Sequence, residues 1–261
     1  MTLVWLGRWK SYYILWSSDL VFSSMVIGTA TKGRVMVGHD VRVSRHTCSS
    51  PLVIGLIFLF FVGAVHAEDC GDPFSNGVGP FDYTNPADRR DPLRIPIVEK
   101  HHFNMDIQTL KGGQTGAYIM TDLDYLLRAV PNHHRGLYTM ARLYTSGVRT
   151  DGAKWSADCY FQRALHFRPT DGVVYMVYGI FLSKQGKFEE AIKNYRQAMK
   201  LLPESAELYY NMGLLYLDQK DYEKAMSFAE KAYALGYPLP GLKDSLKRKN
   251  AWNPSIDLQV K

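Results

Sequence analysis

The sequence lacks the common patterns of catalytic and metal-binding sites. It contains no CxxC pair and no HExxH segment, whose spacings suit zinc ligands. It has no phosphate-binding loop, because Gly186-Lys187 has no glycine upstream and the GGQTG stretch at 112–116 has no lysine. A GxSxG motif and a suitable cysteine nucleophile are also missing. We therefore predict no cofactor, no metal and no catalytic residue, and we favour a binding protein over an enzyme.

A large excess of one charge is missing from most of the chain. The formal net charge is +6, but six basic and two acidic residues lie within the first 67 positions. The remaining positions carry 25 basic and 23 acidic side chains. Nucleic-acid binding usually depends on a clustered basic surface, so we expect no nucleic-acid partner.

Only one long apolar run is present, at residues 51–65, and it carries no charge. Arg42 and Arg45 precede it, and Val65-His66-Ala67 follows it, which is the order of a secretory signal peptide cut after Ala67. The run is shorter than the roughly 20 residues of a membrane-spanning helix. We predict a periplasmic or secreted protein. The alternative is an inner-membrane protein anchored by residues 51–67, and this leader would be its only membrane contact.

The predicted signal peptide lies unusually far from the first residue. Signal peptides normally begin about 15 to 30 residues before the cut, whereas 67 residues precede it here. We expect that the start codon is misassigned, because translation from Met36 would give a signal peptide of nearly normal length. Residues 1–35 would then be an extension without function, and residues 36–67 the signal peptide.

Cysteine is rare, with three residues in the whole chain. Cys48 would leave with the signal peptide, so Cys70 and Cys159 would remain. In an oxidising compartment these two can pair, and a bridge that closes so long a loop would contribute about 4 kcal/mol. Alternatively, Cys159 is a small buried apolar residue on a helix and Cys70 is free near a frayed terminus. The sequence leaves both possibilities open.

The C-terminal half repeats itself at a shift of 34 residues, a period typical of stacked helical hairpins. Small residues coincide at this shift, where they would let paired helices approach closely. A proline ends one of the predicted helices, because it cannot continue the hydrogen-bond ladder. The recurring positions are Gly179 and Gly213, Ala191 and Ala225, Ala198 and Ala232, with Pro203 after the first copy.

This pattern resembles the tetratricopeptide repeat, and the resemblance implies an all-α fold. We expect an array at 122–237 with about three hairpins, the first a degenerate copy near His134, and a capping helix with a tail at 238–261. The Gly- and Pro-rich segment 68–121 is expected to be irregular and to pack on the array, with a short strand at 95–98 and a helix from Asn104. The stretches GPFDY, VEKHHF and LDYLLRAVPNHHRGL are similar to those of exported proteobacterial repeat proteins of unassigned activity.

In this repeat family the first helices of successive hairpins line a concave groove that binds peptides. The resemblance therefore implies a protein partner, either an amphipathic helix, an extended apolar peptide or a second copy of the chain. Alternatively, segment 68–121 or the capping helix covers the groove, because exposed apolar surface is unfavourable without a partner. The groove positions are Tyr138, Arg142, Thr145, Val173, Met176, Ile180, Lys184, Tyr210, Leu214 and Asp218.

Two histidine pairs are the remaining candidates for chemistry. His101 and His102 form one pair, and His133 and His134 form the other. Adjacent residues point to different sides of a helix or strand, so each pair offers one metal ligand, and two ligands make a poor site. We favour histidines with ordinary hydrogen-bond partners, and Asn132 as a helix N-cap. A metal-binding or enzymatic protein built on the region between His101 and His134 is the alternative.

Overall fold

The computed structural model describes residues 69–253, and these form eleven helices without a strand. They all belong to one structural unit. The predicted extension at 1–35 and the predicted signal peptide at 36–67 lie outside the described residues. No helix within 69–253 is both long enough and apolar enough to cross a membrane.

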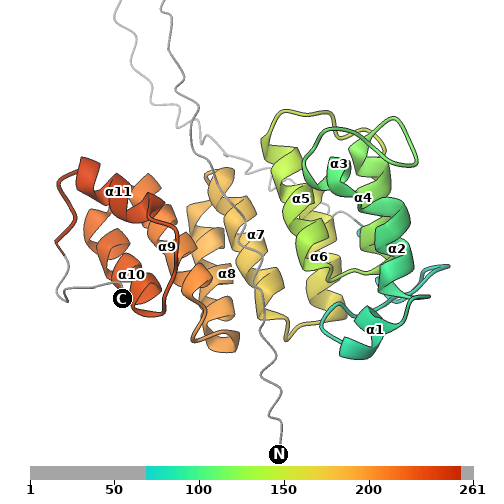
Figure 1. Cartoon of the computed structure of the whole chain (residues 1–261), viewed down its shortest axis with the longest axis horizontal. Coiled ribbons are helices and arrows are strands. Elements are labelled where there is room, and N and C mark those ends of the chain that lie inside the picture. The colour runs from blue at the N-terminus through green and yellow to red at the C-terminus, as the bar shows by residue number, and fades with distance from the viewer. Residues whose placement is uncertain (1–68, 254–261) are drawn as a thin grey trace, which may run out of the picture. The chain divides into compact units, whose positions relative to one another are not determined.

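Three helical hairpins and a final short helix make up the second half of the described chain (Figure 1). This confirms the predicted all-α hairpin array. Within the array, α5 packs against α7 and α7 against α9, so the first helices of successive hairpins are neighbours. The hairpins are α5 (His134–Thr145) with α6 (Ala157–Phe167), α7 (Gly172–Lys184) with α8 (Phe188–Leu201), and α9 (Ala206–Asp218) with α10 (Tyr222–Ala234), and the final helix is α11 (Gly241–Arg248).

Glycine lies where the paired helices meet. A Cβ atom added to Gly179 would be 2.7 Å from a ring carbon of Tyr195 on α8, which is closer than real contacts allow. At Gly213 the added atom would lie 2.4 Å from Leu242 of α11 and 3.3 Å from the carbonyl oxygen of Ala225 on α10. Both repeat glycines therefore permit helix contacts that a larger residue would block.

Two apolar cores meet at α7. Val174 and Phe181 belong to a core that extends over the N-terminal part, whereas Met176 and Leu182 belong to one shared with α8 to α11. This helix is buried from two sides, which explains why GVVYMVYGIFLSK is apolar around almost its whole circumference.

The predicted strand at 95–98 is wrong, because these residues begin α2. Ile95 and Val98 are three positions apart and both buried, so they lie on one side of a helix, and Pro96 is tolerated in its first turn. The helix expected from Asn104 is a single turn. Segment 68–121 is thus partly helical, and α4 completes a half repeat before the hairpins. These elements are α1 (Pro86–Arg90), α2 (Ile95–His102), α3 (Met105–Gln108) and α4 (Ile119–Ala129).

A disulfide joins the start of the described chain to the array. The sequence left this pairing open, and in the structure Cys70 and Cys159 are bonded across 89 residues. Cys159 lies buried on α6, so the bridge attaches the segment around Cys70 to the second helix of the first hairpin. The N-terminal segment also packs on the array through α2 against α4 and α3 against α5.

Candidate protein-binding face

The ten predicted groove residues lie on the first helices of the three hairpins, and we call this set the first-helix face. Three of them are in α5, four in α7 and three in α9. Their accessibility differs along each helix. Tyr138, Met176 and Tyr210 are buried, Arg142, Val173, Ile180 and Leu214 are half-buried, and Thr145, Lys184 and Asp218 are exposed.

The two ends of the first-helix face are partly covered by other parts of the chain. At one end Arg142 donates a 3.0 Å hydrogen bond from Nη1 to the carbonyl oxygen of Gln108, which ends α3. At the other end the ring of Tyr210 stacks on Tyr237, with ring centroids 4.1 Å apart. Segment 68–121 therefore contacts the face at Arg142, and Tyr237, which precedes the predicted capping segment, contacts it at Tyr210.

Half-buried apolar side chains remain between these covered ends. Val173 and Ile180 on α7 and Leu214 on α9 retain part of their surface. Charge is confined to the C-terminal ends of the same helices. There, partial desolvation by neighbouring side chains raises the pKa of the otherwise exposed Asp218, and the positive charge of Lys184 partly opposes that rise. The face thus combines a central apolar strip with a mixed-charge edge.

Two models of the tetratricopeptide repeat match part of the array. The TPR repeat model matches residues 182–220, and a second tetratricopeptide repeat model matches residues 206–235. Residues 182–235 of this chain are tetratricopeptide repeats. Such repeats generally serve as scaffolds for protein–protein interaction. The chain is also 29% identical over 98 residues to the protein O-mannosyl-transferase TMTC3 of Mus musculus, a match that covers 37% of this chain and 10% of that protein.

Three of the four histidines in the two predicted pairs have separate carboxylate partners. His102 lies 3.0 Å from Asp122, and His134 lies 2.8 Å from Asp171. His101 is exposed at the end of α2. Within residues 69–253, no group of three or more His, Cys, Asp or Glu side chains is arranged to hold a metal ion. The four histidines are dispersed over separate contacts and do not form one site.

His133, the remaining histidine, is fully buried and is the N-cap of α5. Its Nδ1 accepts the backbone N–H of Gly136 at 2.9 Å, so its Nε2 carries the proton and donates to Glu99 at 2.9 Å. Burial lowers the pKa of His133, although the hydrogen bond to Glu99 opposes this. Burial alone would raise the pKa of Glu99, but the hydrogen bond from His133 and the positive charge of Arg135 oppose this effect, and the pKa of Glu99 is lowered. The pair is a neutral imidazole that donates to a carboxylate.

Asn132 is not the N-cap that the sequence predicted, because His133 occupies that position. Its side chain instead donates to Asp82 at 2.8 Å and to Asp171 at 3.0 Å, and accepts the backbone N–H of Tyr83 at 2.9 Å. Asp171 is the N-cap of α7. This buried amide therefore links the N-terminal segment to the start of the second hairpin.

Sequence reasoning missed a group of basic residues beside the disulfide. Arg128, Lys154 and Arg163 come from α4, the loop before α6, and α6, and they line one pocket with Trp155. No short motif contains these residues, since 35 positions separate the first from the last. The sequence feature that could have pointed to them is the connection at 146–156 between α5 and α6, which is longer than the corresponding connections in the other two hairpins.

Proposed function

We propose that this tetratricopeptide repeat protein is an adaptor that holds a segment of another protein on its first-helix face. The observation that carries the proposal is the strip of half-buried apolar side chains formed by Val173, Ile180 and Leu214. All three side chains pack against the core that contains the buried Met176, so the helices that carry them are held in place before a partner binds.

An apolar segment suits this face better than a carboxylate terminus. Some members of the family grip a C-terminal carboxylate with several Lys, Arg and Asn side chains. Here Arg142 already donates to the carbonyl oxygen of Gln108, and Asn211 donates to Glu207 within its own helix. An amphipathic helix that covers Ile180 and Leu214 would gain roughly 25 cal/mol for each Å² of apolar surface removed from water.

We further propose that the protein acts outside the cytoplasm. The disulfide between Cys70 and Cys159 supports this location, because disulfides persist in oxidising compartments and are rare in reducing ones. Sequencing the N-terminus of the protein isolated from its native cell tests the proposal. A mature chain that begins at Glu68 and is found in the periplasm or medium supports it. An uncleaved chain in the cytoplasm contradicts it.

Affinity capture with matched variants tests the binding face. The purified protein is used as bait in native extract, alongside the double variant Ile180→Ser and Leu214→Ser. Ile192→Ser is the control, because Ile192 is also half-buried and aliphatic but lies on α8, a second helix. Captured proteins are quantified by mass spectrometry.

We expect one or a few partners to be lost with the double variant and retained with the control. An identical set of captured proteins for all baits would remove the first-helix face from the proposal. Light scattering of each bait shows whether a second copy of the chain is the partner: a dimer that the double variant abolishes would place self-association on this face.

A further inference from the structure

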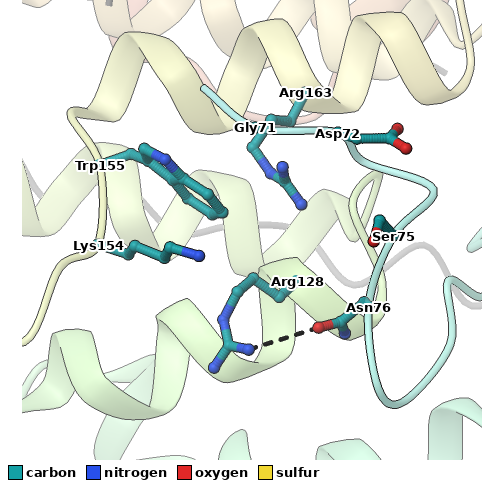
Figure 2. A pocket seen from close by; sticks show the side chains of 8 residues that line it. All are labelled: Gly71, Asp72, Ser75, Asn76, Arg128, Lys154, Trp155 and Arg163. Atoms are coloured by element: carbon teal, nitrogen blue, oxygen red, sulfur yellow. Dashed lines mark hydrogen bonds between the residues drawn. The ribbon is translucent and has the colours of Figure 1, made fainter. Parts of the chain in front are cut away.

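A pocket of ≈ 270 Å³ lies between the N-terminal segment and the first hairpin. Figure 2 shows residues from four parts of the chain around it, including three cationic side chains and one indole ring. The lining residues are Gly71, Asp72, Ser75, Asn76, Arg128, Lys154, Trp155 and Arg163. None of them belongs to the first-helix face.

Arg163 is the central cation of this pocket, and its side chain is 3% exposed. Its guanidinium lies 4.2 Å from the ring centroid of Trp155, and its Nη1 donates to the carbonyl oxygen of Cys70 at 2.9 Å. Lys154 places its Nζ 4.5 Å from the centroid of the same indole. In Figure 2 both cationic groups are directed into the space in front of Trp155.

Arg128 brings a third cation from α4 to the opposite side of the pocket. Its Nε donates to Asp124 at 2.9 Å, and its Nη1 donates to Asn76 at 3.4 Å. Asp124 is engaged further, because it accepts a 2.6 Å hydrogen bond from the hydroxyl of Tyr160. Arg128 therefore has a carboxylate partner, and that carboxylate already binds two donors.

The positive charge at Arg163 and Lys154 is not balanced in the same way. Among residues 69–253, neither side chain has a carboxylate within ion-pair distance, and Nε of Arg163 is buried without a hydrogen-bond partner. Asp72 lines the pocket, but its carboxylate is turned away from the cations in Figure 2 and accepts the backbone N–H of Phe74. Burial lowers the pKa of Arg163, and Tyr160 with the more distant carboxylates of Asp124 and Asp72 only partly opposes this; arginine remains protonated in proteins. A buried charge of this kind is unfavourable without a counter-charge.

The disulfide holds the wall of this pocket in place. Cys70 is bonded to Cys159 on α6 and supplies the carbonyl that Arg163 binds. The next residue, Gly71, has φ +63°, and an added Cβ would lie 3.0 Å from the indole of Trp155. The backbone thus approaches Trp155 closely at a position where a side chain would be strained.

We propose that this pocket binds a small oxyanion, as inorganic phosphate or as the carboxylate of a small organic acid. An oxyanion between Arg163 and Lys154 would supply a counter-charge at ion-pair distance and accept charge-assisted hydrogen bonds, which are stronger than neutral ones. Guanidinium groups bind both carboxylate and phosphate oxygens. The volume is below the range for drug-sized ligands, so it fits a small anion.

Calorimetric titration of the oxidised protein with sodium phosphate, and separately with sodium succinate, tests the proposal and distinguishes the two sources. Ionic strength is kept constant with chloride. The key variant is Lys154→Met, which removes an exposed cation, and the control is Lys193→Met, which removes an exposed cation from α8. We expect saturable binding of one anion, at least ten-fold weaker in Lys154→Met and unchanged in Lys193→Met. No saturable binding of either anion, or equal binding by both variants, overturns the proposal.

The indole N–H resonances provide a second readout that does not require a substitution at the buried Arg163. During the same titration, the ¹⁵N–¹H signal of Trp155 should shift in a saturable way, whereas that of Trp252, at the far end of the described chain, should not. Reduction of the disulfide should weaken the shift, because it releases the wall that Cys70 and Gly71 form. A Trp155 signal that does not move with either anion contradicts the proposal.

Discussion

Replacing Gly179 with alanine tests the packing on which the hairpins depend. An added Cβ would lie 2.7, 2.8 and 3.0 Å from three ring carbons of Tyr195, so it would meet the broad side of the ring. Tyr195 is 1% exposed and belongs to the core shared by α7 to α11. The ring therefore has no open space to move into, and the two helices must separate.

The expected cost follows from two opposing effects. Inserting a methyl group into a packed core costs about 1–3 kcal/mol. Replacing a glycine in a helix interior by alanine stabilises the folded state by roughly 0.5–1 kcal/mol, because alanine loses less conformational entropy on folding. The difference between the two effects is a loss of about 0–2.5 kcal/mol. Because the ring of Tyr195 cannot move aside, we expect the upper part of this range for Gly179→Ala, about 1–2.5 kcal/mol, or a fall in Tm of roughly 2–10 °C for a domain of this size.

Denaturant and thermal unfolding followed by circular dichroism measure this change. Gly77→Ala is the control, since an added Cβ there has no atom within 4 Å. We expect that variant to remain within about 0.5 kcal/mol of the wild type. If Gly179→Ala were as stable as Gly77→Ala, glycine would not be what allows α7 and α8 to approach, and the steric account of the repeat would be refuted.

Three further predictions concern stability. Replacing Cys70 and Cys159 with serine and alanine should lower the free energy of unfolding by about 4–5 kcal/mol, because the bridge closes a loop of 89 residues; an unchanged urea midpoint would contradict this. The pKa of His133 is lowered in the folded state, so its contribution to the free energy of unfolding is complete above about pH 6.5 and is lost as the pH falls from there through the folded pKa. The variant His133→Asn should therefore show a weaker dependence of Tm on pH between about 6.5 and 5. An equal slope for the variant and the wild type would refute this prediction. Asn132→Leu should cost roughly 1–3 kcal/mol, because the buried Asp171 and the half-buried Asp82 each lose one donor and the backbone N–H of Tyr83 loses its acceptor; a loss below 1 kcal/mol in chemical unfolding would argue against that network.

The repeat could be predicted because its cause is local and periodic. Gly179 and Gly213 recur at the positions where helices approach, and the spacing alone places them on successive hairpins. The segment before the array has no period to rely on. The apolar stretch from Ile95 to Val98 is too short for its periodicity to distinguish a strand from a helix. In the structure both side chains are buried on one side of α2, so tertiary packing determines that this segment is helical.

The sites formed by distant residues could not be predicted in the same way. Cys70 and Cys159 were recognised as a possible pair, but their pairing depends on how the N-terminal segment meets α6. Arg163 had no marker in the sequence, since arginine on a helix is usually exposed. The margins of the first-helix face depended on Gln108 and Tyr237, whose positions follow from the chain's path and not from the repeat.

Site-specific photo-crosslinking in the native cell tests the central claim most directly. A photoreactive phenylalanine derivative replaces Lys184, which is exposed on the first-helix face, or Lys193, which is exposed on α8. The account predicts a discrete protein adduct from position 184 and none of that mass from position 193. Identical adducts from both positions, or no adduct from position 184, would contradict the claim that this face binds a protein.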